Sequence, residues 1–265
     1  MSARRVAVSE TVEEFEASIV SREGAENCAR GGHAFASISD FTLWQLVNSA
    51  FPTGGFAHSA GLEAAWQHGE VRNRGELVSL LEASLNQLGR AALPFVTTSW
   101  REPERVAEFD ELCDVFTTNH VANRASRLQG KAFLTAVNRI FSERGQPCPH
   151  EPLASGGLAD KAVRAPVCHF APVFGASLRR LDVPRETTAR MFFFSYLRGA
   201  FAAAVRLNII GPMEGQMLQH RLGPKAEEVL RRCESLTLDD IAQTAPLLDL
   251  WQGAQDRLYS RLFQS

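Results

Sequence analysis

Hydrophobic residues recur at helical spacing over most of the chain. Between residues 41 and 51, one stripe is formed by Leu43, Leu46, Val47 and Ala50. A second stripe, between residues 77 and 95, is formed by Leu77, Leu80, Leu81, Leu85, Leu88, Ala92 and Phe95. Apolar positions three and four residues apart lie on one face of an α-helix. No stretch alternates convincingly between apolar and polar residues with flanking hairpin turns, so the pattern predicts an all-α fold.

Polar residues and prolines predict several helix boundaries. Asn73 followed by Glu76 resembles a capping box. Pro94 predicts a kink or an end late in the second stripe, and Pro103 suits the first turn of a new helix. The apolar face of that new helix is formed by Val106, Phe109, Cys113 and Phe116. The apolar face of the helix after it is formed by Val121, Ala125, Leu128 and Ala132.

The second half of the chain continues the helical pattern after a break. Residues 142–166 are rich in glycine and proline and predict a long loop. Residues 185–208 then form the most apolar helix, which we expect to be central to the core or covered by another subunit. Two more helical runs follow, near 213–234 and 237–263.

The same pattern predicts the domain organisation. Residues 1–38 are polar and lack sustained periodicity, so we interpret them as a flexible N-terminal tail. Residues 39–265 are predicted to form a single globular helical bundle of about eight to ten helices.

Charge and cysteine content narrow the function classes. The 28 Lys and Arg residues nearly balance 30 Asp and Glu residues, so the net charge is -2 and gives no global attraction to nucleic acid or membranes. One local cluster, Arg124, Arg127 and Lys131, predicts a solvated helix face, with a partner-binding patch as the alternative. No apolar run is long enough to span a bilayer, and the N-terminus lacks the apolar core of a secretory signal. The five cysteines form no CxxC pair, so reduced thiols in the cytoplasm are expected.

The stretch "FPTGGFAHSAGLE", residues 51–63, holds the densest group of candidate functional residues. It has no lysine, so it does not match a phosphate loop, and its glycines do not form a dinucleotide-binding pattern. His58, Glu63 and His68 are each five residues apart, so adjacent members would diverge by about 140° on a helix and would not converge on one metal ion. The stretch therefore predicts a tight turn between two helices, with a conformation that depends on its glycines.

Other candidate chemistry is sparse. Cys148 and His150 are weak metal-ligand candidates in the long loop, and Cys168 with His169 favours a structural role. We identify no catalytic residue and no nucleophile elbow. Two alternatives stay open: a metal-dependent all-α hydrolase that uses His58, Glu63 and His169, and a generic helical interaction module.

Four segments, in order, resemble the urease accessory protein F family. They are the stretch at 51–63, "HFAPVFG" at 169–175, "AAAVRLNIIGP" at 202–212 and "LYSRLFQS" at 258–265. The resemblance spans roughly residues 41–265 and is closer to plant-type members. Ala57 departs from the Ser or Thr that the family commonly has, and Pro212 departs from the Gln of many bacterial members.

The resemblance implies a function. Members of the family are non-catalytic adaptors that form homodimers and bind the urease accessory D/H protein. Together they recruit the G-protein GTPase to apo-urease for GTP-dependent nickel insertion, and a role in regulating that GTPase is also proposed for the family. The resemblance therefore implies a cytoplasmic chaperone that binds no cofactor tightly, because nickel and GTP are handled by its partners.

The resemblance and the residue types together give a set of candidate site residues. Glycines in the stretch at 51–63 permit positive φ and close backbone approach, and aromatic residues with arginines near the C-terminus have the composition of interface anchors. The candidate partner-binding or signature residues are Gly54, Gly55, Phe56, His58, Ser59, Gly61, Leu62, Glu63, Tyr259, Arg261, Leu262 and Phe263. Closure of the core by Leu262 and Phe263 is the alternative to a partner contact.

Overall fold

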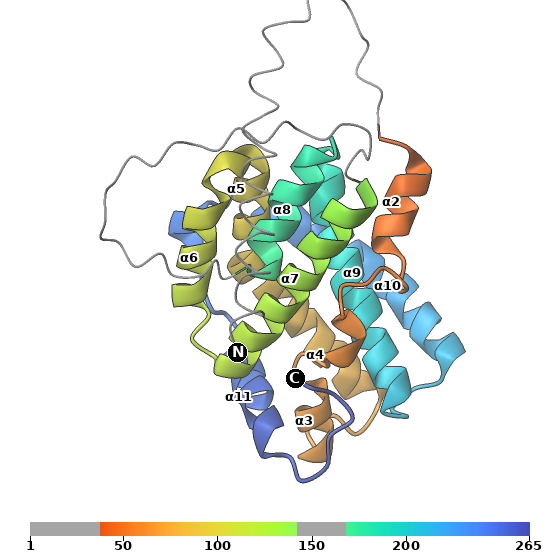
Figure 1. The fold of residues 1–265 in the computed structure, drawn as a ribbon. Helices are drawn as coiled ribbons and strands as arrows, with labels where there is room; N and C mark the ends of the chain where they lie inside the picture. The colour runs from red at the N-terminus through yellow and green to blue at the C-terminus, as the bar shows by residue number, and fades with distance from the viewer. Residues whose placement is uncertain (1–37, 142–167) are drawn as a thin grey trace, which may run out of the picture.

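The computed structural model describes residues 38–141 and 168–265, and every regular element within these ranges is a helix (Figure 1). The α-helices are α2 (Asp40–Val47), α3 (Leu62–Gln67), α4 (Arg74–Gln87), α5 (Leu93–Arg101), α6 (Val106–Phe116), α7 (His120–Phe141), α8 (Phe170–Arg180), α9 (Arg185–Arg206), α10 (Pro212–Cys233) and α11 (Pro246–Ala254). Short 3₁₀ helices are η1 (Gly55–Ala57), η3 (Pro103–Arg105), η4 (Leu238–Asp240) and η5 (Gln255–Arg257), and η2 (Leu88–Ala92) is a π-helix. The predicted all-α class is confirmed. The predicted loop 142–166, and the predicted tail apart from Ile38, lie outside the described residues.

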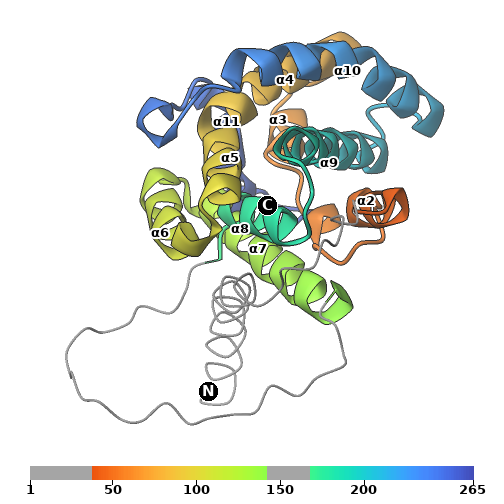
Figure 2. The same cartoon turned by 90° about the horizontal axis from the view of Figure 1, so that it is seen from above.

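Helix α9 is the centre of the bundle. It contacts α2, α3, α4, α5, α8 and α10, which surround it in the view from above (Figure 2). Its buried side chains include Phe192, Phe193, Leu197 and Phe201. This position confirms the prediction of a helix central to the core. Within residues 38–141 and 168–265, none of the helices has both the length and the hydropathy that a bilayer-spanning segment requires.

A cluster of phenylalanine rings joins α7, α8 and α9. The rings of Phe133 and Phe174 lie 5.1 Å apart, and those of Phe174 and Phe192 lie 5.5 Å apart. Phe51, which precedes the turn before α3, extends the cluster with its ring 5.7 Å from that of Phe133. Aromatic pairs at these separations add attraction beyond the burial of their area. The cluster therefore fixes the start of the stretch at 51–63 against the core.

Two glycines permit unusually close contacts around α8. A Cβ atom added at Gly175 would lie 2.1 Å from the carbonyl oxygen of Val96 on α5. A Cβ atom added at Gly130 on α7 would lie 2.0 Å from the carbonyl oxygen of Cys168, just before α8. Only glycine leaves space for these backbone approaches. Gly175 is the last residue of the "HFAPVFG" segment, so packing against α5 explains its presence there.

The predicted boundaries around α4 and α5 agree with the structure. The Asn73 side chain accepts a hydrogen bond from the backbone N–H of Glu76, 3.1 Å away. The Glu76 carboxylate accepts from the backbone N–H of Arg72 rather than from that of Asn73, so only half of the capping box is formed. Helix α4 runs into the π-helical turn η2 immediately before Pro94, which lies in the first turn of α5. Proline has no N–H to donate to the preceding turn, which accounts for the predicted interruption.

The prediction of one helical run at 237–263 is wrong. Thr237 caps only the short η4, and the backbone N–H groups of Thr244 and Ala245 donate to the side chain of Gln87 instead of to a helical carbonyl. Pro246 disfavours a helical conformation at the residue before it, so α11 begins there as a separate helix. After Arg257 the chain is no longer helical. The backbone N–H groups of Leu262 and Phe263 donate to the Glu63 carboxylate instead of to helical carbonyls.

The predicted apolar face of α7 is wrong at one position. Leu128 is 49% exposed, whereas Val121, Ala125, Phe133 and Val137 are buried. Gly130 faces the start of α8, and a residue two positions away projects about 200° around the helix. Leu128 therefore lies on the outer face of α7, next to Arg127 and Lys131, which are exposed as predicted.

Candidate functional site

Two segments that are far apart in the sequence meet at one end of the bundle. They are the turn at residues 51–63, called turn 51–63, and residues 255–265, called the C-terminal segment. The backbone N–H of Gln264 donates to the carbonyl of Ala57 at 2.8 Å, and the N–H of Ser59 donates to the carbonyl of Ser265. The chain end lies beside the segment that leads into α3 (Figure 1). We call this contact between the two segments the joint.

Glu63 is the centre of the joint. Its side chain is buried, and its two carboxylate oxygens accept hydrogen bonds from the backbone N–H groups of Leu262 at 2.6 Å and Phe263 at 3.1 Å. The side-chain amide of Gln255 donates to the same carboxylate at 2.6 Å. A buried carboxylate is stable only when donors replace the water that it loses. Glu63 therefore holds the C-terminal segment in place.

Arg206 at the end of α9 connects a third segment to the joint. Its guanidinium lies 4.2 Å from the centre of the Phe263 ring and donates to the carbonyl oxygen of Phe56 at 2.5 Å. Because Arg206 belongs to the "AAAVRLNIIGP" segment, three of the four family-like segments contact one another. The sequence prediction missed Arg206 and Gln255, although the position of Arg206 inside a matching segment was a usable signal.

The C-terminal segment divides its side chains between core and solvent. Phe263 is 4% exposed, so it closes the core, whereas Leu262 is 51% exposed and Tyr259 is fully exposed. Phe56 of the turn is also 73% exposed. Exposed aromatic and aliphatic side chains on a rigid support are typical of a protein-binding surface. The joint therefore presents Phe56, Tyr259 and Leu262 outward while Glu63 and Phe263 fix the backbone.

Asp256 links the C-terminal segment to α7. Its carboxylate accepts two hydrogen bonds from Arg124, at 3.0 and 2.8 Å, and one from Arg261 at 3.0 Å. The Nε2 atom of His120 lies 3.4 Å from the same carboxylate. Hydrogen bonds from Arg124 hold the pKa of Asp256 below its ordinary value. Arg261 is thus partly neutralised at the surface, next to the exposed Leu262.

The glycines of turn 51–63 have different roles. Gly54 and Gly61 have φ values of 71° and 86°, in the left-handed region that favours glycine, whereas Gly55 is not among the residues with positive φ. A Cβ atom at Gly61 would also lie 3.0 Å from the backbone nitrogen of Gln252 on α11. Gly61 therefore permits both the turn and the contact with α11. The buried Leu62 and Ser59 complete the entry into α3.

His58 closes the joint through its imidazole. Its Nδ1 atom lies 2.5 Å from the hydroxyl oxygen of Ser265. Burial lowers the pKa of His58 from its ordinary 6.5, and the nearby Arg124 lowers it further. The neutral ring is therefore the form that the joint favours.

This pKa shift predicts a pH dependence. Below pH 6.5 the released histidine takes up a proton that the docked one resists, so docking should weaken as the pH falls below that value. We expect faster hydrogen exchange at the amides of Ser59 and Gln264 at pH 5.5 than at pH 7.5, after correction for intrinsic exchange rates. His58→Gln should flatten this dependence. An equal pH dependence in the variant and the wild type would contradict the assignment.

The "HFAPVFG" segment forms a separate buried polar anchor. The Asp110 carboxylate accepts from the backbone N–H groups of Cys168 and His169, both at 2.6 Å. The His169 ring contacts the Ser126 hydroxyl at 3.1 Å and the Asp114 carboxylate at 3.2 Å. Burial raises the pKa of the Cys168 thiol to about 11, so it is not a thiolate at neutral pH. These contacts fix the start of α8 to α6 and α7, which favours the structural interpretation of Cys168 and His169.

The structure does not assemble the candidate metal residues. His58 and Glu63 are occupied by the C-terminal segment, and His169 is bonded to α6 and α7. No group of three or more His, Cys, Asp or Glu side chains able to hold a metal ion occurs within residues 38–141 and 168–265. Cys148 and His150 lie outside the described residues.

Comparison with known proteins decides the family. The UreF family model matches residues 71–223, which is more than half of the chain. The chain belongs to the UreF family. Its UreF-family relatives include "Urease accessory protein F" of Oryza sativa subsp. indica, 37% identical over 86% of this chain and 87% of the relative. The protein of the same name from Arabidopsis thaliana is 36% identical over 87% of this chain and 94% of the relative.

Bacterial members of the UreF family are more distant. "Urease accessory protein UreF" of Roseobacter denitrificans is 27% identical over 84% of this chain and 93% of the relative. The predicted resemblance to the family, and to its plant-type members in particular, is therefore confirmed. The matched family region ends before the C-terminal segment, whereas the alignments to the plant relatives cover most of the chain.

Proposed function

We propose that this chain is a non-catalytic adaptor in urease maturation. In this proposal it binds the urease accessory D/H protein, and the two recruit the G-protein GTPase to apo-urease for GTP-dependent nickel insertion. The observation that carries the proposal is the joint, in which buried residues fix a C-terminal segment whose Tyr259 and Leu262 are free to contact a partner. Membership of the UreF family supports the urease system as the setting.

The proposal assigns nickel and GTP to the partners. The polar side chains of turn 51–63, His58 and Glu63, bind the C-terminal segment, and this structural role accounts for their presence. The alternative of a metal-dependent hydrolase has no supporting geometry in the part of the chain that the structure describes. We therefore favour an adaptor that acts in the cytoplasm through protein contacts.

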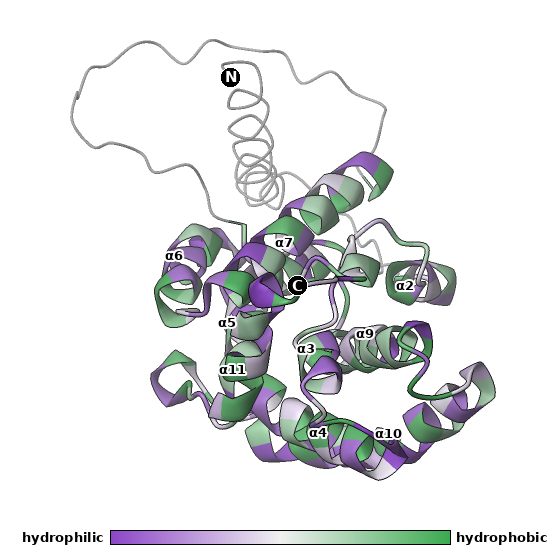
Figure 3. Cartoon of the chain, turned by 90° about the horizontal axis from the view of Figure 1, so that it is seen from below, coloured by the Kyte–Doolittle hydropathy of each residue, from purple (hydrophilic) through white to green (hydrophobic). Residues whose placement is uncertain are grey.

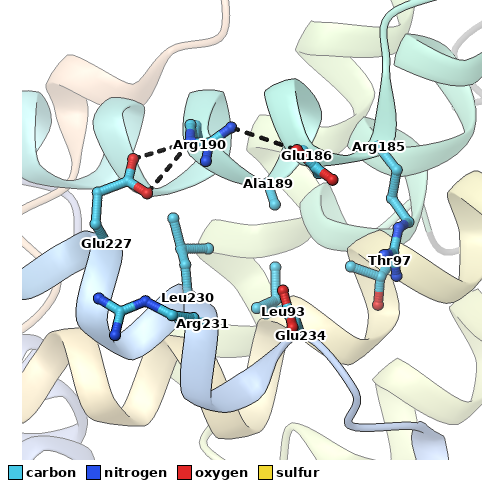
Figure 4. Close-up of a pocket in the computed structure, with 10 residues that line it drawn as sticks. All are labelled: Leu93, Thr97, Arg185, Glu186, Ala189, Arg190, Glu227, Leu230, Arg231 and Glu234. Atoms are coloured by element: carbon cyan, nitrogen blue, oxygen red, sulfur yellow. Dashed lines mark hydrogen bonds and ion pairs between the residues drawn. The ribbon is translucent and has the colours of Figure 1, made fainter.

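We also propose that the chain forms a homodimer. A pocket of about 230 Å³ lies between α5, the first turns of α9 and the end of α10, at the other end of α9 from Arg206 (Figure 4). Its wall combines the Arg190–Glu227 ion pair at 2.9 Å with an apolar floor of Leu93 and Leu230. Phe194, one turn further along α9, is 43% exposed. Mixed charge beside the exposed Phe194 suits a self-complementary interface. Sedimentation at only the 29.2 kDa monomer mass would contradict the homodimer.

One experiment tests the adaptor function and its surface together. In cells whose copy of the gene is deleted, we expect loss of urease activity and of urease-bound nickel, both restored by the wild-type chain. The Tyr259→Ala/Leu262→Ser double variant should restore about a tenth or less of the activity, because exposed anchors of this kind contribute most of an interface's binding energy. Both residues are exposed, so the free energy of unfolding should be unchanged.

A matched variant makes the result specific. Leu247→Ser/Leu250→Ala changes two residues of α11 that are also exposed, and it should restore nearly full activity. Normal urease nickel content in the deletion strain would refute the adaptor function. Full rescue by the Tyr259→Ala/Leu262→Ser variant would refute the assigned surface.

A further inference from the structure

The outer face of α7 carries an unusual concentration of positive charge. This helix of 22 residues contains Arg124, Arg127, Lys131 and Arg139 and no Asp or Glu. Hydrophilic segments repeat along its length (Figure 3). Four cations on one helix that has no acidic residue repel one another. Negative charge from outside the helix would offset this repulsion. The near-neutral chain thus carries a local basic surface on α7.

The four cations share a side of the helix. At 100° per residue they lie within about 120° of one another, and from Arg124 to Arg139 they extend about 22 Å. Leu128, which is 49% exposed, lies among them. We call these five residues, Arg124, Arg127, Leu128, Lys131 and Arg139, the α7 stripe.

Most of the α7 stripe lacks a partner within the described residues. Arg124 is bound to Asp256, but no hydrogen bond or ion pair joins the side chains of Arg127, Lys131 or Arg139 to any residue in 38–141 or 168–265. Arg261 adds a further cation beside Arg124 through their shared Asp256. The α7 stripe therefore begins at the joint and continues away from it. Along it, Arg127 is close enough to Asp114 of α6 for its charge to help lower the pKa of that carboxyl group, whereas Lys131 and Arg139 have no ion-pair partner among the described residues.

We infer that the α7 stripe is a docking site for an acidic, amphipathic segment of a protein partner. Charge complementarity identifies the occupant as anionic, and Leu128 offers it one apolar contact within the row of cations. The stripe's length matches an acidic helix of about 15 residues. The inference goes beyond the proposed function, because binding to this face requires neither urease nor nickel.

Other polyanions fit the α7 stripe less well. Single-stranded nucleic acid would be expected to stack on aromatic side chains, and none lies among the five stripe residues. A membrane surface would be expected to bury a broad apolar face, whereas Leu128 is a single side chain. The net charge of -2 also gives the whole chain no long-range attraction to either.

A binding measurement with the full-length chain tests the inference. The probe is a fluorescein-labelled helical peptide of about 15 residues with glutamates on one face and a leucine in each turn, and its control is the same peptide with glutamine for glutamate. Fluorescence anisotropy should show salt-dependent binding of the acidic peptide and none of the control peptide. Arg127→Gln/Lys131→Gln should weaken binding about fivefold or more at roughly 0.1 M salt.

A matched variant removes the same charge elsewhere. Arg101→Gln/Arg221→Gln neutralises two exposed arginines that likewise have no hydrogen-bonded partner among the described residues, and it should change the affinity less than about twofold. Arg127→Lys keeps the charge and should keep the binding. Failure of the wild type to bind the acidic peptide, or equal weakening by the two double variants, would overturn the inference. Tighter, stripe-dependent binding of a short DNA duplex or of phosphatidylserine vesicles would overturn the choice of a protein segment.

Discussion

Glu63→Ala is expected to detach the C-terminal segment without unfolding the bundle. The wild-type carboxylate accepts from two backbone N–H groups and from Gln255, all in a buried setting. Alanine leaves these donors without acceptors, which costs about 3 kcal/mol or more. Detachment lets the donors reach water at the price of exposing Phe263. The lost hydrogen bonds should therefore weaken the docking of the C-terminal segment rather than the stability of the whole bundle.

Hydrogen exchange measures this opening directly. In Glu63→Ala we expect the amides of Leu262 and Phe263 to lose at least about a hundredfold of protection, while amides of α9 keep theirs. Trypsin should also cut faster after Arg257 and Arg261. The isosteric Glu63→Gln should be intermediate, because its oxygen still accepts but its NH₂ group faces a donor.

Glu70→Ala is the matched control for this experiment. Glu70 lies seven residues further along, is exposed and makes no side-chain hydrogen bond with a described residue. We expect no change in the exchange of the C-terminal segment in this variant. Unchanged protection of Leu262 and Phe263 in Glu63→Ala would show that other contacts hold the segment.

Gly175→Ala is expected to be strongly destabilising, although it adds only one methyl group. The new Cβ would lie 2.1 Å from the Val96 carbonyl oxygen, so α5 and α8 must move apart. Neither backbone can yield as a flexible side chain would, because the two helices pack along their length. We expect a loss of about 3 kcal/mol or more in the free energy of unfolding, measured by urea denaturation followed by circular dichroism.

Gly199→Ala is the control for backbone crowding. Gly199 lies inside α9, and a Cβ atom there would have no heavy atom within 4 Å. Alanine favours a helix interior over glycine by about 0.5–1 kcal/mol, so this variant should be neutral or stabilising. Equal stability of the Gly175→Ala and Gly199→Ala proteins would contradict the close contact between α5 and α8.

The helices themselves were predictable because their cause is local. The spacing of Leu77, Leu81 and Leu85 identifies the buried face of α4, and Asn73 marks its start. The apolar composition of residues 185–208 likewise predicts the central position of α9. Each of these features depends on residues within a few turns of one another, so the printed order of the residues is sufficient.

The C-terminal part was less predictable because its cause is remote. Residues 237–263 have enough apolar residues for a helix, but Gln87 and Glu63 take up backbone N–H groups of that region from other parts of the chain. Leu128 shows the same limit, since only the approach of residue 168 to Gly130 decides which face of α7 is buried. Acceptors and neighbours that lie outside the segment concerned have no signature in a local pattern.

The candidate site was predicted in its members but not in its arrangement. The resemblance selected Glu63, Phe263 and Tyr259, and the residue types suggested an interface. The sequence could not show that Glu63 binds the backbone of the C-terminal segment, or that Phe263 faces the core while Tyr259 faces solvent. Arg206 was missed because a single arginine at a helix end has no distinctive local pattern.

The separation of the joined residues has a consequence for biosynthesis. His58 and Ser265 are 207 positions apart, so a ribosome must deliver nearly the whole described chain before the joint can close. Contacts of such long range form late, after the helices that carry them have assembled. Until then, the joint does not fix the positions of Tyr259 and Leu262. The surface of the joint can therefore form only after residues 255–265 have been synthesised, so a shorter nascent chain does not yet present it.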